Sequence, residues 1–263
     1  MKRNNLFWGI ILISFGGIFF LDAIDILPGY PPEYLWQIFL ILLGSWIILN
    51  SYWKPKYEKY EHKTIALAGA TRAKIHINHG AGLLNINSGT TKGDLLTYSS
   101  MGTIQQSIRR EIETLEVRLS PGSDIFPLLG FAEGFNWDLQ LSEEIPLSLI
   151  LETGASQTNA NLNDLNITDL KLSTGASTSS IILPSKPERS NISINAGVAS
   201  LNIHIPTNVD ARIRFKEGLT SLTIDKDRFT RINSNTYQSQ NFDFGTHRTE
   251  IVIEAGIGSI SIN

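Results

Sequence analysis

Two histidines are the first residues of this chain whose spacing could support chemistry. His76 and His79 lie three residues apart in KIHINHG, and two imidazoles at such a spacing can bind one metal ion. The alternation of apolar residues in this segment turns His76 outward, however, and no third ligand is fixed by spacing. Surface histidines are therefore the better interpretation, and we predict no metal site.

Two pairs of glutamates could act as general acids and bases. Glu111 lies near Glu113, and Glu143 is followed by Glu144. Acid–base catalysis needs a carboxyl group in a cleft with a partner that shifts its pKa, and nothing in the sequence predicts such a cleft. Solvated strand edges explain the glutamates better, so we predict that the protein is not an enzyme and has no catalytic or cofactor-binding residues.

A serine that follows a glycine turn is the third candidate, because the tetrapeptide TGAS occurs at residues 153–156 and again at 174–177. The chain has no G-x-S-x-G elbow, P-loop, dinucleotide fingerprint or calcium-binding tandem repeat. TGAS is instead one version of a longer repeat. Relative to its glycine, the residues at positions −5, −3, +4 and +6 are apolar, and only Thr158 and Ser179 depart from this rule. The rule holds for seven glycines: Gly80, Gly122, Gly154, Gly175, Gly197, Gly218 and Gly256.

The repeat predicts the elements that would position all these side chains. Alternation on both sides of the glycine indicates two short strands with one buried face, and the glycine supplies a turn conformation that side chains resist. One such unit cannot bury its apolar face alone, but a stack of units can. We predict an all-β domain built as a β-solenoid-like stack, with a β-sandwich of antiparallel hairpins as the alternative. The spacing breaks at residues 87–110, 129–147 and 225–248.

Composition excludes one class of function. The 263 residues carry a net charge of −3, contain no cysteine and are 42% hydrophobic. These values are typical of a chain with a sizeable core. The slightly acidic net charge gives no excess of basic residues that would attract nucleic acid, so we predict no DNA or RNA partner.

The first 53 residues predict a transmembrane helical hairpin. Residues 6–21 and 35–49 contain no charge, and with their flanks they give helices at about 6–22 and 35–52. The prolines of PGYPPEY separate the two helices. A cleaved signal peptide is the alternative, but no small-residue cleavage site follows the first block. A charged juxtamembrane linker at 54–63 then leads to the β-repeat domain at 64–263.

The cations predict the orientation of the hairpin. Lys2 and Arg3 precede the first block, and four lysines between residues 54 and 63 follow the second, whereas the connecting loop has only acidic residues. Positive charge stays on the cytoplasmic side, so we expect a multi-pass protein of the cell membrane with both termini in the cytoplasm.

These segments resemble a known family. FWGIILISFGGIFFLD and LWQIFLILLGSWIIL resemble the paired membrane segment of LiaF-like bacterial proteins. DLKLSTGASTSSIILP, INAGVASLNIHIP and IEAGIGSISIN resemble the toast-rack and adhesin-type β-repeat domains found behind it. The resemblance implies a bacterial membrane protein that is not an enzyme, and in LiaF itself a partner that restrains a sensor kinase during cell-envelope stress. It gives no site residues.

Two hypotheses of function follow. The first is a membrane-anchored regulatory or scaffolding protein that contacts a protein partner, such as a membrane sensor kinase. The second is a surface-exposed, adhesin-like binding module. The final repeat ends at Asn263 without a polar cap, so we also expect self-association or a partner at that strand edge.

Overall fold

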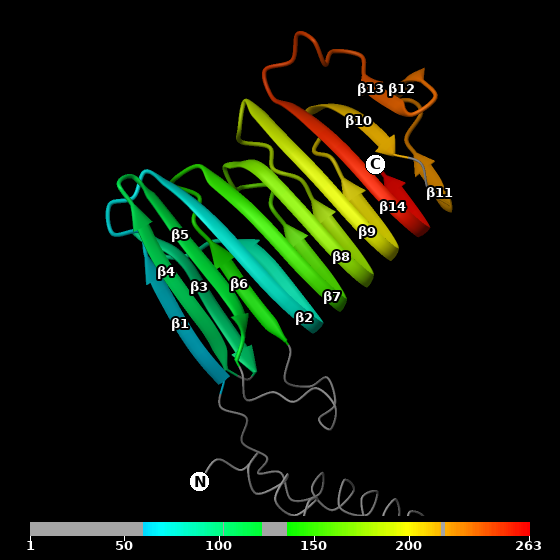
Figure 1. Cartoon of the computed structure of the whole chain (residues 1–263). Helices are drawn as coiled ribbons and strands as arrows, with labels where there is room; N and C mark the ends of the chain where they lie inside the picture. The colour runs from blue at the N-terminus through cyan, green and yellow to red at the C-terminus, as the bar shows by residue number, and fades with distance from the viewer. Residues whose placement is uncertain (1–59, 102, 123–135, 217–218) are drawn as a thin grey trace, which may run out of the picture. The chain divides into compact units, whose positions relative to one another are not determined.

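The computed structural model describes residues 60–101, 103–122, 136–216 and 219–263. The chain divides into two units, residues 1–57 and 58–263, and the described residues all belong to the second. They form fourteen strands of one sheet and no helix, so the all-β prediction is confirmed for them (Figure 1). The strands are β1 (Tyr60–Ala66), β2 (Arg72–Ser88), β3 (Asp94–Met101), β4 (Ile104–Glu111), β5 (Thr114–Pro121), β6 (Trp137–Leu141), β7 (Leu147–Asn161), β8 (Ile167–Ile182), β9 (Arg189–His204), β10 (Asp210–Lys216), β11 (Leu219–Ile224), β12 (Phe229–Asn233), β13 (Thr236–Ser239) and β14 (Arg248–Ile262).

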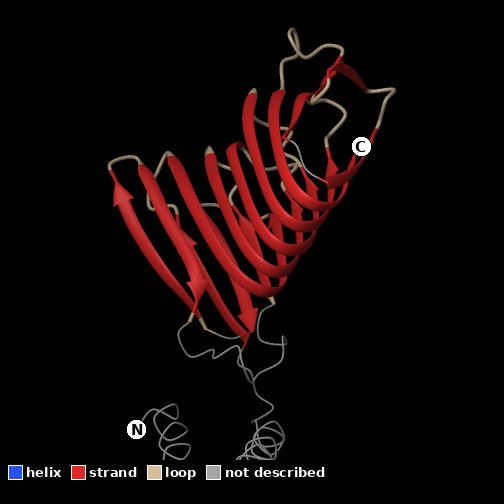
Figure 2. Ribbon diagram, turned by 45° about the vertical axis from the view of Figure 1, so that its right-hand side comes forward, coloured by secondary structure: helices blue, strands red, loops and turns tan. Residues whose placement is uncertain are grey.

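Five long strands, β2, β7, β8, β9 and β14, each contain a whole repeat with its glycine near the middle. Figure 2 shows long strands of the stack that bend near their middle. We call the bend the corner, and the two halves of each strand the N-terminal and C-terminal arms. In β7, alternate residues of Leu147–Thr153 are buried, Gly154 and Ala155 both face outward, and alternate residues of Ser156–Ala160 are buried. Two consecutive outward residues shift the alternation by one, which keeps the apolar face on the inside of both arms.

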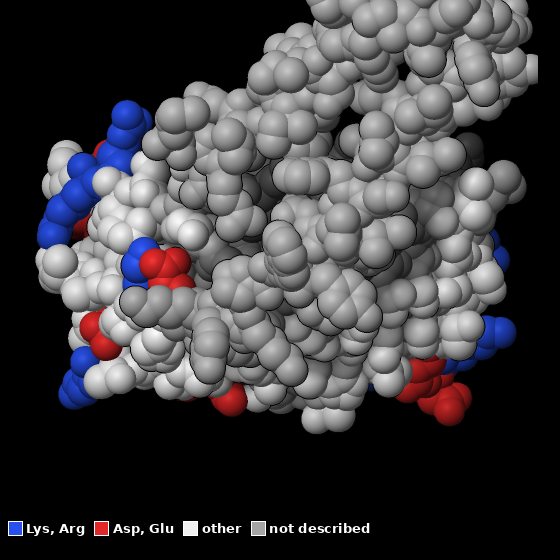
Figure 3. Space-filling model, turned by 90° about the horizontal axis from the view of Figure 1, so that it is seen from below, with Lys and Arg blue, Asp and Glu red and all other residues white. Residues whose placement is uncertain are grey.

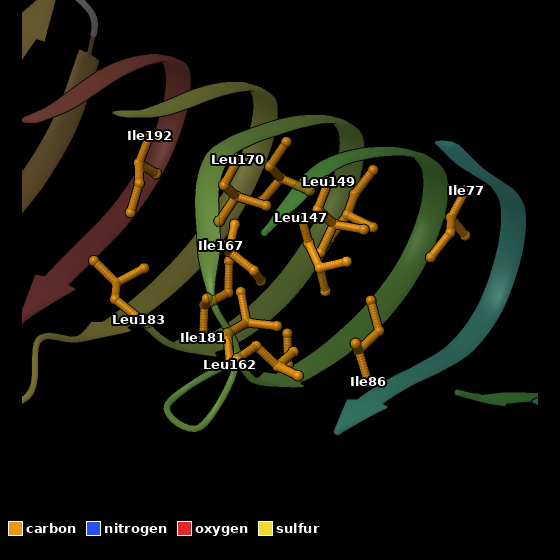
Figure 4. Close-up of a cluster of buried hydrophobic side chains, with 14 of the residues drawn as sticks. Ile77, Ile86, Leu147, Leu149, Leu162, Ile167, Leu170, Ile181, Leu183 and Ile192 are labelled. Carbon is orange, nitrogen blue, oxygen red and sulfur yellow. The ribbon is translucent and has the colours of Figure 1, made fainter. Parts of the chain in front are cut away.

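The long strands are parallel and in register, so equivalent positions of the repeat form rows across the sheet. Leu149 of β7 lies beside Ile75 of β2 and Leu170 of β8, and the row continues through Ile192 and Ile251. This arrangement is the predicted solenoid-like stack, and the strands that the structure describes do not form the alternative antiparallel sandwich. The expected aliphatic residues fill the space between the arms (Figure 4). Each buried aliphatic side chain contributes roughly 1.5 to 3 kcal/mol, which supports folding as a stack.

Two repeats are split into separate strands at the ends of the stack. β5 and β6 pair with the two arms of β2, and β10 and β11 pair with the two arms of β14. Trp137 and Leu139 occupy the inward positions that the repeat rule assigned to Phe126 and Leu128, which lie outside the described residues. The long segment after Gly122 is thus an insertion within one repeat.

Antiparallel strands extend the stack at both ends. At one end, β4 pairs with β5, β3 pairs with β6, and β1 pairs with β3. At the other end, β13 pairs with β10, and β12 pairs with β13.

The prediction of an open edge at Asn263 is wrong. β14 lies between β9 on one side and β10 and β11 on the other, because the chain leaves the stack after β9 and returns to fill the place beside it.

The membrane hairpin predicted for residues 1–53 lies outside the described residues. Within the part of the chain that the structure describes, no helix has the length and hydropathy needed to cross a membrane. β1 begins at Tyr60, inside the stretch that the sequence assigned to a charged linker.

Candidate functional site

The corner glycines of neighbouring long strands lie against one another. A Cβ atom on Gly154 would collide with the carbonyl oxygen of Gly80, and one on Gly175 would lie 3.1 Å from the carbonyl oxygen of Gly154. The corresponding distances are 3.1 Å from Gly197 to Gly175 and 2.8 Å from Gly256 to Gly197. None of these corner glycines has a positive φ. The expectation that they supply an unusual turn conformation is therefore wrong, since what they permit is close approach of two backbones.

A groove runs along the outside of the corner, because the glycines place no side chain there. It has a volume of about 870 Å³ and crosses β2, β7, β8, β9 and β14. Four corner glycines line it, together with residues that directly precede a corner glycine, namely Thr153, Thr174, Ala196 and Ala255. One wall is the row of residues two positions before each glycine, namely Asn78, Glu152, Ser173, Asn195 and Glu254. We call this feature the corner groove.

Both carboxylates of the groove wall lie close to a basic side chain. Glu152 lies 3.0 Å from the Nε2 atom of His76, and Glu254 accepts a hydrogen bond of 2.8 Å from the Nζ atom of Lys216. Figure 3 shows acidic and basic atoms together in small groups on the described part of one side of the domain. Glu152 and Glu254 are about half exposed, so each pair contributes at most about 1 kcal/mol to stability. A ligand can therefore displace the basic side chain from either carboxylate at low cost.

Small and aliphatic residues occupy the row that follows the glycines. Ala155 and Ala176 are exposed, and Val198 and Ile257 are 58% and 57% exposed. Val198 and Ile257 are neighbours in the register of β9 and β14. The outer corner thus combines a polar row, a bare backbone and, at the β9–β14 end, exposed aliphatic side chains.

The two histidines face opposite sides of β2. His76 points outward to Glu152, as predicted, whereas His79 is fully buried and packs edge-on against the Trp137 ring with centroids 5.1 Å apart. His79 is therefore not a surface histidine, because it continues the inward row of Ile75 and Ile77. In the described parts of the chain, no three His, Asp or Glu side chains gather at a distance suited to one metal ion.

The glutamate pairs hold loops and strand ends. Glu113 lies in the turn that joins β4 to β5 and accepts a hydrogen bond of 3.3 Å from Thr71. Glu143 accepts one of 2.7 Å from Lys186, and this bond holds the pKa of Glu143 below its ordinary value. Glu144 accepts one of 3.1 Å from the Gly93 amide. All three carboxylates are exposed, as expected for solvated edges.

The TGAS serines belong to the inside of the corner. Ser156 is buried, and Ser177 lies beside it in the next strand. Thr158 and Ser179, the two exceptions to the apolar rule, are also neighbours and are 0% and 1% exposed. None of these four hydroxyls has a hydrogen-bond partner among the described atoms. A nucleophile needs a base within hydrogen-bond reach, so this arrangement is a polar seam in the core.

A family model for the N-terminal domain of toast_rack, DUF2154, matches residues 54–204. The chain belongs to the toast-rack family. A solved structure of a candidate cell adhesion protein from Clostridium sporogenes ATCC 15579 has the same fold, with a TM-score of 0.70 and 21% identity. The similarity covers 78% of this chain and 98% of that one. A candidate adhesin from Bacteroides fragilis NCTC 9343 is a more distant match, with a TM-score of 0.31 and 8% identity over 79% of this chain and 98% of that one. The chain matches no curated protein sequence.

Sequence reasoning missed two polar residues, one towards each end of the stack, that join neighbouring segments of the toast-rack domain. Tyr98 on β3 is fully buried and donates a hydrogen bond of 3.3 Å to Gln106 on β4, and burial raises its pKa. Arg228 precedes β12, and its guanidinium donates to the carbonyl oxygens of Ile205, Pro206 and Val209. No periodicity marks these contacts, because they involve segments outside the repeat.

Proposed function

We propose that this toast-rack protein is a membrane-anchored, non-enzymatic regulatory or scaffolding protein whose β-domain binds a protein partner. The corner groove carries the proposal. It is a shallow surface that crosses five hydrogen-bonded strands. Its polar row and glycine backbone, with exposed Val198 and Ile257 in the next row of the corner, suit an extended protein segment. The resemblance to LiaF-like proteins suggests a membrane sensor kinase as the partner, and the hairpin of residues 1–53 as the anchor with both termini in the cytoplasm.

The test is affinity capture from detergent-solubilised membranes with the full chain and two double variants. Ser173→Arg with Asn195→Arg fills the corner groove with bulky cations. Ser180→Arg with Asn202→Arg places the same charges on the outer face of the C-terminal arms, away from the groove. We expect the control variant to retain the partner captured by the wild-type chain and the groove variant to lose it. Failure to capture any protein reproducibly, or equal capture by both variants, would reject the proposal.

An exported, adhesin-like binding module is the second candidate, and the fold shared with the candidate cell adhesion protein from Clostridium sporogenes favours it. The two candidates differ in which side of the membrane holds the β-domain. Protease added to intact cells spares a cytoplasmic domain and digests an exported one. A reporter fused after Asn263 that is active only in the cytoplasm would exclude the adhesin candidate.

A further inference from the structure

Four strands form the open edges of the described sheet, and one of them differs from the others. β1, β4, β11 and β12 each pair on one side only. β1 carries Glu61 and Lys63, β4 carries Arg109 and Arg110, and β12 carries Arg231. Charges of this kind protect an edge from pairing with another chain. β11, with the sequence LTSLTI, has no charged residue and no proline, so its edge is unprotected.

The sheet next to β11 is uncharged as well. In the C-terminal arms from Gln157 on β7 to Thr223 on β11, the outward residues include no Asp, Glu, Lys or Arg. The N-terminal arms of the same repeats carry outward charges such as Lys171, Arg214 and Glu250. Two C-terminal arms can therefore join edge to edge without repulsion between like charges.

The sequence of β11 is complementary to itself. An antiparallel pair centred on Leu222 places Leu222 opposite its copy and Ser221 opposite Thr223. Residues that face each other then share a face of the sheet, with hydroxyls opposite hydroxyls on the outside. Leu222 is only partly buried in a single copy, and its own copy would cover it.

We propose that β11 pairs antiparallel with β11 of a second copy of the chain, so that the sheet continues from one molecule into the other. Figure 1 shows β11 at the end of the stack, next to β14. The partner is a second copy because the edge supplies its own complement in charge, size and hydrogen bonding. The inference does not rest on the proposed function.

The register of this pair can be tested by charge. In the dimer, residue 221 of one copy faces residue 223 of the other, so Ser221→Lys with Thr223→Lys sets lysine against lysine twice. Ser221→Lys with Thr223→Glu sets lysine against glutamate twice. The measurement is sedimentation velocity of the full chain in a non-ionic detergent over a concentration series. We expect a wild-type dimer, roughly tenfold or greater weakening in the double-lysine variant, and restored dimerisation in the lysine–glutamate variant.

Ser259→Lys with Ser261→Lys is the matched control. These residues are the register neighbours of Ser221 and Thr223 on β14, so the same charges lie one strand inside the edge. The control should dimerise like the wild type, and far-ultraviolet circular dichroism should show that all variants are folded. A monomeric wild type would overturn the proposal, as would a dimer that the double-lysine variant leaves intact.

Discussion

Alanine substitutions at the corner glycines should have graded effects that follow the distance between neighbouring strands. The Cβ of Gly80→Ala meets no described atom within 4 Å. This substitution should be neutral or stabilise the fold by about 0.4 to 1 kcal/mol, because alanine restricts the unfolded chain. Gly175→Ala brings its Cβ to 3.1 Å from a carbonyl oxygen, so a small strain offsets that gain. Gly154→Ala collides with the carbonyl oxygen of Gly80, and overpacking should cost about 1 to 3 kcal/mol or more.

The assay is urea unfolding of the full chain followed by far-ultraviolet circular dichroism. Transition midpoints should fall in the order Gly80→Ala, Gly175→Ala, Gly256→Ala and Gly154→Ala, with Gly256→Ala placed third by its 2.8 Å contact. Equal loss of stability at Gly80 and Gly154 would refute the reasoning. It would show that the glycines are needed for a turn conformation common to all repeats, as their sequence pattern first suggests, and not for close approach of the backbones.

Three further predictions concern buried or partly buried polar groups. Thr158→Val should raise the free energy of unfolding by about 1 kcal/mol, since it removes a buried hydroxyl without a described partner, and a lower urea midpoint would contradict this. Arg228→Met should destabilise the domain by about 2 to 4 kcal/mol in the same assay, because it removes the donor of three carbonyl oxygens, and an unchanged midpoint would show that solvent satisfies them. Tyr98 has a raised pKa in the folded state because it is buried. Its neutral form therefore contributes stability below the pKa of the unfolded chain, and this contribution is lost as the pH rises through the folded-state pKa. Tyr98→Phe should flatten the fall in stability above about pH 10, which unfolding midpoints measured across that range would reveal.

The repeat pattern predicts most of the core, because period-two alternation determines which side chains of a strand face inward. Once one face of a strand is buried, the identity of every inward residue follows from a single reference position. Ile75, Leu149, Leu170, Ile192 and Ile251 illustrate this, since equal offsets from their glycines place them in one row of the sheet. The inward position of His79 follows from the same rule.

The corner groove could not be read from the sequence in the same way. Its wall residues, such as Asn78 and Ser173, are outward polar residues like many others, and they gain significance only because the glycines beside them stack without side chains. The repeat pattern predicts the positions of the glycines but not the physical reason for them. The contact that requires Gly154 is with Gly80, which lies 74 residues away along the chain and is brought close only by the order of the strands.

The spacing of the glycines along the chain does not determine the order of the strands in the sheet. Gly218 follows Gly197 by 21 residues, the same interval as between Gly154 and Gly175, yet β14 separates the two repeats. Strands lie about 4.8 Å apart, and the five residues between β9 and β10 can span about 16 Å, so the loop reaches past one strand as easily as it reaches the adjacent position.

A second glycine marks the strands where the stack departs from chain order. Among the seven repeats, only two have glycine two positions after the corner, Gly82 on β2 and Gly258 on β14, and both have positive φ values, of 110° and 149°. A Cβ on Gly258 would collide with the carbonyl oxygen of Ala199 on β9, so this glycine lets β14 fit beside β9. β2 and β14 are also the strands that border the two split repeats. The family match ends at residue 204, where β9 ends, so it is the segment beyond the match that supplies β14 and covers the free side of β9.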